Sequence, residues 1–295
     1  MGCTTSSPTA LPPPVVCTLT SSAITKTEND LYKDEESEWL LPHEPIRQEF
    51  LRVEHALKQF DLVNCPWHIS VLHTWLNEYF FRAVHFHHDN EEKIVGPYWQ
   101  KLGETTDFGK TAGHAEIVSM MDSFDADVKA VKDYVADAAK TTTPASELKA
   151  KQAELQTKWA AFQSLMFVHL AEEEVFWPQV YARHDKKHAK AVVDLILAAD
   201  FKLKGKDAVA GHAFAGAVMD CVGPFKARYA KYKYSPPSHA LDMGPWCARE
   251  FGEKFMKQIP YVPRVLILPS FHKEYILKWR VLIESIGGTV NPLST

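Results

Sequence analysis

Apolar residues recur at steps of three and four positions along most of the chain, which is the period of an amphipathic helix. The first such segment opens at Pro42, because proline is tolerated in the first turn of a helix. It runs to about Phe60 and places Ile46, Phe50 and Val53 on one face. This pattern predicts a helix with one side turned toward an apolar core.

Three more segments with the same period follow. They cover residues 65 to beyond 95, 111–139 and 144–183. Pro97 is expected to kink or end the second helix, because a proline inside a helix lacks a backbone N–H donor. Thr143 and Pro144 suit a helix cap and a first helical position. Since strand alternation is missing from this span, the sequence predicts an all-α fold built on an antiparallel four-helix bundle.

The carboxy-terminal third continues the helical pattern but contains no motif that we can assign. Further helical stretches are expected around residues 208–232, 247–256 and 270–286. Proline-containing connections separate them, so this region is expected to extend the bundle or to cap it. The chain therefore divides into three parts: a tail (1–38), a four-helix bundle (42–185) and a helical extension (186–295).

The amino-terminal tail is rich in Pro, Thr and Ser and then becomes polar and acidic. Such a segment buries too little apolar surface to offset its chain entropy, and we expect it to be disordered. It begins Met1-Gly2-Cys3, which fits myristoylation of Gly2 and palmitoylation of Cys3. Because two lipid chains hold a protein stably where one does not, this start predicts a tether on the cytoplasmic side of a membrane.

Composition and charge exclude several other classes of protein. The net charge of -4, the pI of about 6.4 and the lack of a conspicuous Lys/Arg cluster argue against a nucleic-acid partner. The five cysteines are scattered without a Cys-x-x-Cys pair, which favours a reducing compartment over a disulfide framework or a thiolate zinc site. No uninterrupted apolar run is long enough to span a bilayer.

Candidate metal chemistry comes from a sequence pattern that occurs twice. The first copy is HDNEEKIVGP (88–97) and the second is HLAEEEVFWP (169–178). Each has a His, a Glu four residues later and a Pro five residues after that Glu. Residues four apart share one helix face, so each copy aims an imidazole and a carboxylate at one point. A metal ion is the simplest species that would bind an imidazole and a carboxylate together.

Two single histidines extend the pattern to all four predicted helices. His43 lies at the start of the first helix and His114 at the start of the third. In an antiparallel bundle these starts lie beside the ends of the second and fourth helices, which carry the two His-x-x-x-Glu pairs. All four groups are therefore expected at one end of the bundle.

Some ligand assignments have alternatives. His87 and Glu91 have the same spacing as His88 and Glu92, and we favour the second pair because its offset to Pro97 matches that of the second copy. His55 competes with His43, which is favoured by its depth in the bundle. The remaining histidines are expected at surface or structural positions: His68, His73, His85, His184, His188, His212, His239 and His272.

This arrangement of single histidines and His-x-x-x-Glu pairs resembles the hemerythrin-like family, also called HHE cation-binding domains, over about residues 42–185. The resemblance implies a non-haem di-iron centre in a four-helix bundle, with two glutamates bridging the metals. Carried over to this chain, the implied ligands are His43, His88, Glu92, His114, His169 and Glu173. Manganese or zinc fits this donor set less well.

The match departs from the oxygen-carrying members of that family at two points. Those proteins have a fifth His at the position of Val118, and their fourth-helix carboxylate is an Asp at a different spacing, whereas here it is Glu173. The resemblance therefore implies iron bound for sensing, storage or a redox response, with oxygen, peroxide or nitric oxide as the small ligand. The lack of a Gly-rich phosphate loop and of a Gly-x-Ser-x-Gly motif argues against nucleotide use and serine hydrolysis. We expect a binding protein rather than an enzyme. A weaker alternative is a di-iron oxidase or peroxidase with an organic substrate, for which nothing in the sequence marks a pocket.

Two other classes of protein were compared with this reading. A ferritin-like bundle needs Glu-x-x-His on two helices, and no His in this chain has a Glu three residues before it. The remaining alternative is a lipid-anchored helical module for protein interaction, in which the metal site is structural or vestigial. In that case the carboxy-terminal helices would carry the partner surface.

Overall fold

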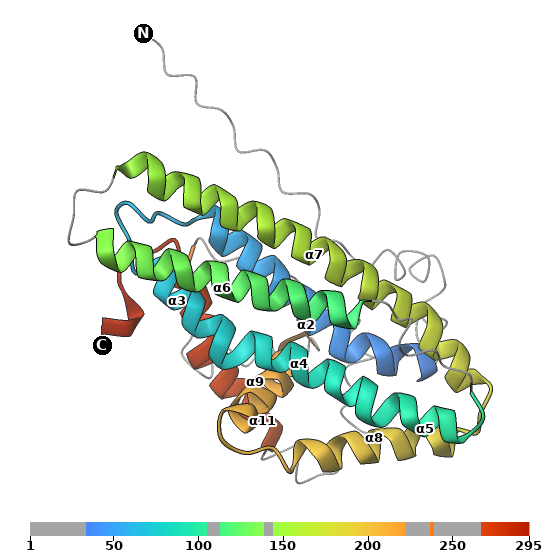
Figure 1. Cartoon of the computed structure of the whole chain (residues 1–295). Helices are drawn as coiled ribbons and strands as arrows, with labels where there is room; N and C mark the ends of the chain where they lie inside the picture. The colour runs from blue at the N-terminus through green and yellow to red at the C-terminus, as the bar shows by residue number, and fades with distance from the viewer. Residues whose placement is uncertain (1–33, 105–112, 139–143, 222–236, 239–266, 295) are drawn as a thin grey trace.

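The structure is a computed structural model that describes residues 34–104, 113–138, 144–221, 237–238 and 267–294. These residues form helices joined by turns, and no strand occurs among them (Figure 1). The predicted all-α class is therefore confirmed. Gly2, Cys3 and the helix expected at 247–256 lie outside the described residues.

The first helix is longer than expected. Helix α2 (Asp34–Lys58) begins inside the predicted tail and runs through Pro42 and Pro45. All eight residues 43–50 are buried. Eight residues make more than two helical turns, so this part of α2 is covered by protein on every side.

The second helical segment is continuous from His68 to Lys101 and contains two wider turns. Its parts are α3 (His68–Trp75), the π-helical turn η1 (Leu76–Phe80), α4 (Phe81–Asn90), the π-helical turn η2 (Glu91–Val95) and α5 (Gly96–Lys101). Pro97 was predicted to kink or end the helix, but the helix continues past it. Directly before Pro97 the Gly96 N–H donates to the Glu91 carbonyl five residues back, and this wider turn gives the proline ring room.

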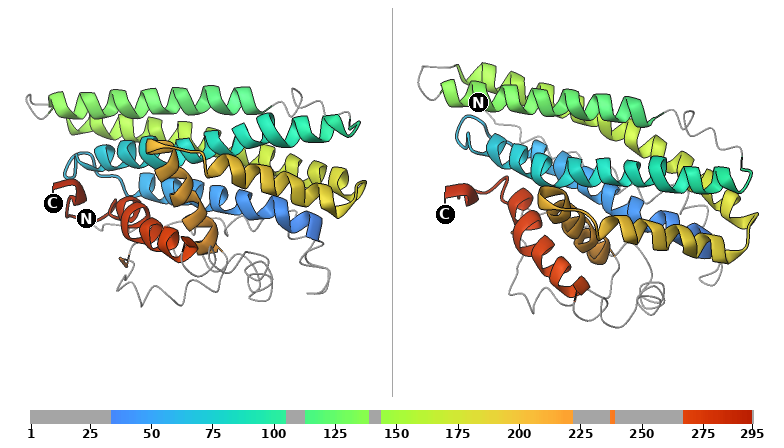
Figure 2. Two further views of the ribbon diagram at one scale, coloured as in Figure 1. Left: turned by 90° about the horizontal axis from the view of Figure 1, so that it is seen from below. Right: turned by 60° about the horizontal axis from the view of Figure 1, so that its bottom comes forward.

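Helices α6 (His114–Ala138) and α7 (Ala145–Ala182) complete a set of four helical segments that lie side by side (Figure 2). Each segment runs opposite to the one before it, as the colour order in Figure 1 shows. Aromatic residues join them: Phe50 stacks on Trp159 at 4.8 Å between ring centres and meets Phe80 edge-on at 5.2 Å. Residues 139–143, including the predicted cap Thr143, lie outside the described part.

The carboxy-terminal region packs onto this set and shares its core. It contains α8 (Lys186–Asp200), α9 (Gly205–Cys221), α11 (Leu268–Glu274), η5 (Tyr275–Arg280), α12 (Val281–Glu284) and η6 (Pro292–Ser294). Ala213 of α9 and Trp279 of η5 belong to the same buried apolar cluster as Phe50. At Gly216 an added Cβ would lie 2.5 Å from the Phe271 carbonyl oxygen, so α9 and α11 approach too closely for a side chain there. The extension therefore adds a further layer to one common core.

Charged residues lie buried between α2 and these later helices. Arg280 donates to Asp220 at 3.1 Å, and Arg52 approaches the same carboxylate at 3.5 Å. The hydroxyls of Tyr79 and Tyr275 both donate to Glu49 Oε1. Buried ion pairs of this kind are costly to break by removing one partner, so they fix how the extension sits on α2.

His272, expected at an ordinary polar position, also belongs to this region. Its side chain is fully buried, with Nε2 3.4 Å from Asp220 Oδ1.

No helix among the described residues has both the length and the apolarity needed to cross a bilayer.

Candidate metal centre

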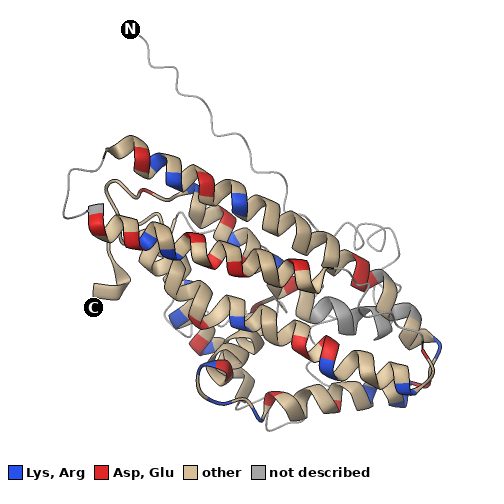
Figure 3. Cartoon of the chain, in the orientation of Figure 1, with Lys and Arg blue, Asp and Glu red and all other residues tan. Residues whose placement is uncertain are grey.

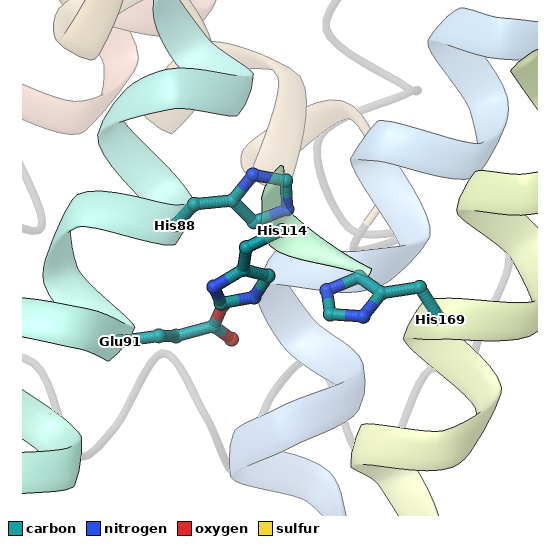
Figure 4. Close-up of side chains that lie close together, drawn as sticks. All are labelled: His88, Glu91, His114 and His169. Atoms are coloured by element: carbon teal, nitrogen blue, oxygen red, sulfur yellow. The ribbon is translucent and has the colours of Figure 1, made fainter. Parts of the chain in front are cut away.

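Two groups of buried His and Glu side chains in the described part of the chain could hold metal ions. One group contains His88, Glu91, His114 and His169, whose ligand atoms lie within 4.8 Å of one another (Figure 4). The other meets the same limit and contains His43, His87, Glu91 and Glu173. Glu91 belongs to both groups, so the two candidate positions are adjacent.

The antiparallel arrangement explains why these residues meet. His43 lies on α2, His114 is the first residue of α6, and His169 lies late in α7. His87 and His88 are consecutive on α4, and consecutive residues on a helix point about 100° apart. One therefore faces each group, while Glu91 lies one turn further along, within reach of both.

Glu91 lies between the two groups. Its Oε1 is 3.3 Å from His87 Nε2 and 3.8 Å from His43 Nε2. Its Oε2 is 3.4 Å from His114 Nε2. Each carboxylate oxygen is therefore directed at a different group.

Glu173 has the same arrangement from the opposite side. Its Oε2 is 3.5 Å from His43 Nε2, and its Oε1 is 3.3 Å from His169 Nε2 and 3.4 Å from His114 Nε2. Two carboxylates thus connect a group of two imidazoles to a group of three. This is the donor arrangement that a pair of metal ions with shared carboxylates needs.

The polar atoms at the centre are buried but make no well-formed hydrogen bond within the described chain. They include both oxygens of Glu91 and of Glu173, and the Nε2 atoms of His87, His88, His114 and His169. Leaving one buried polar group unsatisfied costs on the order of 1–3 kcal/mol. Buried atoms with lone pairs gathered in two adjacent groups could hold metal ions, which would accept those lone pairs.

The charges of the metal-free centre are distributed unevenly. Burial alone would lower the pKa of His43, but its bond to Glu174 and the nearby Glu91 raise it to about 9. Burial alone would also lower the pKa of His114. The nearby carboxylates of Glu173 and Glu91 outweigh burial and raise this pKa to about 10. Burial lowers the pKa of His87 to about 4. Without metal, His43 and His114 therefore carry the positive charge of the centre at neutral pH.

The two glutamates respond in opposite directions. Burial and the neighbouring charge of Glu91 raise the pKa of Glu173. Burial opposes ionisation of Glu91 as well, but the surrounding imidazoles, with His87 the largest contributor, hold its pKa well below the usual value. A divalent cation placed between them would favour the ionised form of both carboxylates and would displace the protons of the two charged histidines.

Carboxylates outside the centre orient two of the imidazoles. His43 Nδ1 lies 3.1 Å from Glu174 Oε1, and Arg47 donates to both oxygens of Glu174 at 2.6 and 2.9 Å. His114 Nδ1 lies 2.9 Å from Glu92 Oε1. A carboxylate that accepts the Nδ1 proton leaves Nε2 free to bind metal, and such partners raise metal affinity.

The structure brings together five of the six predicted residues. They are His43, His88, His114, His169 and Glu173. Glu92 lies outside both groups: its side chain is 50% exposed and, among the described residues, contacts the outer nitrogen of His114. Glu91 occupies the central position that the sequence analysis predicts for Glu92. His87, from the less favoured of the two His-Glu pairs, supplies an additional imidazole.

The wider turn η2 explains why Glu91, and not the predicted Glu92, lies between the two groups. Glu173 precedes Pro178 by five residues, and Glu91 precedes Pro97 by six. A π-helical turn holds one more residue than an α-helical turn, so counting back from Pro97 along a regular helix arrives one residue too late. His55 lies twelve residues beyond His43 on α2, on the order of 18 Å away along the axis, and is in neither group.

Residue 113 lies so close to the His169 ring that it must lack a side chain, which the sequence pattern did not show. A Cβ at Gly113 would lie 2.9 Å from His169 Nδ1 and 3.2 Å from its Cγ. We predict that Gly113→Ala displaces the His169 ring and weakens metal binding by roughly tenfold or more, without removing a ligand. Calorimetric metal titration should show the loss.

Gly211→Ala is the matched control for Gly113→Ala. Its new methyl would meet only the tip of Leu203 at 3.0 Å, and Gly211 lies on α9 away from both groups. The control should bind metal as the wild type does. Equal affinities for the two variants would contradict the role of Gly113.

Comparison of the chain with protein-family models, with curated proteins and with solved structures gave no match. The chemistry of the centre therefore follows from its own residues and their geometry.

Proposed function

We propose that this chain is a hemerythrin-like protein that binds two non-haem iron ions and, through them, a small ligand such as oxygen, peroxide or nitric oxide. The observation that supports it best is the pair of carboxylates, Glu91 and Glu173, each directing one oxygen at each imidazole group. The four antiparallel helical segments, each supplying at least one donor, support a bundle of hemerythrin type.

The donor set favours iron over other metals. All donors are imidazole nitrogens or carboxylate oxygens, a mixture that suits iron or manganese at least as well as zinc. Structural zinc sites are closed by four ligands, whereas three imidazoles and two carboxylates surround one of the candidate positions.

The two candidate positions differ in how many donors they have. His43 and His87 face one position, and His88, His114 and His169 face the other, with both carboxylates available to each. The first position has four protein donors and keeps more room for an exogenous ligand. Iron held there would supply redox chemistry and a vacant coordination position. The chain's own part is to hold the donors, exclude bulk water and orient His43 through Glu174.

His87 changes one of the two departures from the oxygen-carrying members of the family. The residue where oxygen carriers have their fifth imidazole is Val118, but His87 brings the number of imidazoles at this centre to five. The number of imidazoles therefore no longer argues against oxygen carriage, while the fourth-helix Glu173 remains a difference from those carriers. Acylation of Gly2 and Cys3, if present, would hold the centre at a membrane.

Iron loading of the full chain tests the proposal. We expect two iron ions per chain by elemental analysis, and charge-transfer absorption in the near ultraviolet and visible range once the iron is oxidised. Parallel loading with manganese(II) should give weaker binding than iron(II). A content below one iron per chain, without the charge-transfer absorption, would favour the alternative of an interaction module with a structural site.

A further inference from the structure

Helix α8 carries a concentration of exposed apolar side chains. Among the ten large apolar residues that are exposed in the described chain, four lie within nine residues. These are Val193 (37% exposed), Leu195 (46%), Leu197 (46%) and Phe201 (73%). Single exposed apolar residues are ordinary on protein surfaces, but a group of this density on one helix marks an interaction surface.

Helical geometry separates this surface from the side of α8 that packs on the protein. Val192 is fully buried in a small core with Trp99 of α5 and Trp177 of α7, and Ile196 packs against the same core. Val193, Leu197 and Phe201 recur every four residues and so form a stripe on another face. The helix is therefore held by one side and presents an apolar stripe on the other.

Lysines surround the stripe. Residues 186–206 contain six Lys and two Asp, a formal charge of +4, while the whole chain has -4, so the rest of the chain carries -8. All six lysines are exposed. Figure 3 shows them as blue segments at both ends of α8. Because apolar residues separate them, they form no run in the sequence.

We infer that α8 and the turn after it form a docking surface for an anionic lipid membrane. An interfacial helix lies in the membrane plane with its apolar residues among the acyl chains and its lysines at the headgroups. At 15 residues, α8 is about 22 Å long and can lie flat in this way.

The charge argues against a second copy of the chain as the occupant. Pairing this surface with that of a second copy would bring two segments 186–206, each of formal charge +4, together, and like charges across an interface oppose association. An anionic bilayer attracts the same lysines, by on the order of 1 kcal/mol for each one near the surface. The inference rests on α8 alone and is independent of metal binding.

This surface would complement the predicted acyl chains. A single myristoyl chain gives only marginal membrane binding, and a second signal makes it stable. A protein-borne surface at α8 would supply that signal even where Cys3 is not palmitoylated. It would also fix the orientation of the folded part, which a long amino-terminal tail cannot do.

Vesicle sedimentation of the full chain bearing Gly2→Ala tests the inference, because this variant cannot be myristoylated. The probes are vesicles of phosphatidylcholine alone and vesicles that also contain phosphatidylserine. We expect at least about tenfold tighter binding to the anionic vesicles, falling toward the neutral value at high salt.

Variants on the same background separate the apolar and charged contributions. Leu197→Gln with Phe201→Gln should weaken binding at least about tenfold, and Lys202→Gln with Lys204→Gln about fivefold per lysine. Val168→Gln, which changes a 55% exposed apolar residue on α7, should bind as the parent does.

Three outcomes would overturn the inference. The first is equal binding to neutral and anionic vesicles, and the second is equal loss in the α8 variant and the Val168 control. The third is no vesicle binding at all together with dimers in solution that the α8 variant abolishes. Circular dichroism should confirm that every variant keeps its helical content.

Discussion

Replacing Glu91 with Gln should remove both metal ions from the chain, whereas the same change at Glu92 should leave both bound. Glu91 directs its two oxygens at different imidazole groups, so the amide loses the negative charge and one donor at the junction of both positions. We expect metal affinity to fall by more than about a thousandfold, beyond the tenfold to hundredfold typical of an outer partner.

Glu92→Gln is the matched control because it is the adjacent carboxylate. Its side chain is half exposed and its contact in the described part of the centre is with Nδ1 of His114, and Gln keeps an oxygen that can accept from that nitrogen. Its metal affinity should fall at most about tenfold. Iron content by elemental analysis and competition with a chelator of known affinity measure both variants.

The opposite ranking, or equal losses in the two variants, would return the bridging role to Glu92. Glu173→Gln provides a second check, since Glu173 lies between the same groups from α7. It should behave as Glu91→Gln does. Far-ultraviolet circular dichroism should show unchanged helical content, so that loss of metal is not mistaken for unfolding.

The sequence predicts most of this centre because its ligands follow helical periodicity and chain direction. His43 and His114 at helix starts meet His88 and His169 near helix ends, as antiparallel neighbours require. These relations depend only on the order of helices along the chain. They need no knowledge of side-chain packing, and the structure brings all four histidines together.

The choice between adjacent residues could not be made in the same way. In a regular helix His88 pairs with Glu92, four residues on, and His87 with Glu91. The structure uses both histidines with Glu91 alone, because a carboxylate one turn away lies between two consecutive residues. The wider turn η2 then shifts the register against Pro97. A π-helical turn has no reliable sequence signal. The sequence therefore could not show which of the two adjacent carboxylates, Glu91 or Glu92, lies between the imidazole groups.

The role of the carboxy-terminal helices was also beyond the sequence pattern. Polar residues on α2 such as Gln48, Glu49 and Arg52 are typical of a solvated helix face, yet all three are buried. Glu49 and Arg52 are covered through contacts with residues more than 150 positions away, Tyr275 and Asp220. Burial on both sides fixes the helix that carries His43 and Arg47, so the extension helps to hold His43 in the candidate centre.

The free energy of unfolding of the metal-free protein should fall as pH rises from 6.5 to 9. The pKa of His43 is about 9 and that of His114 about 10 in the metal-free fold, against 6.5 in an unfolded chain. Below pH 6.5 both states hold these protons, and the stabilisation is fully present. Above it only the folded state holds them, so the free energy of unfolding falls until the folded pKa is passed.

Neighbouring groups do not reverse this trend. Burial and Glu91 raise the pKa of Glu173, so it too holds a proton more tightly in the fold and contributes in the same direction. Burial lowers the pKa of His87 to about 4, that of His169 to about 3 and that of His88 well below its usual value, so these groups are already neutral in the fold. Their titration near pH 6.5 in the unfolded chain opposes the trend only at the acid edge of the window. The expected slope is up to about 1.4 kcal/mol per pH unit for each proton held.

The metal-loaded protein should not show this fall. Metal competes with the protons on His43 and His114, so its affinity rises by up to about tenfold per pH unit for each proton displaced, and this rise offsets the falling stability of the metal-free fold. With free metal at about a thousand times the dissociation constant, loading adds about 4 kcal/mol of stability. For a chain of this size that raises the melting temperature by on the order of 10 °C. Thermal melts with metal and with chelator, from pH 6.5 to 9, measure both trends.

Two matched variants identify which groups cause the pH dependence. Glu174 accepts from His43 and Arg47, and Glu104 forms a similar exposed set with His184 and Arg183. Glu174→Gln removes the charge that raises the pKa of His43 and should flatten the metal-free slope, whereas Glu104→Gln should leave it unchanged. A metal-free protein whose melting temperature is constant over the window would show that the protons of the centre do not stabilise the fold. Equal slopes in the two variants would show that Glu174 and the proton on His43 do not cause the pH dependence.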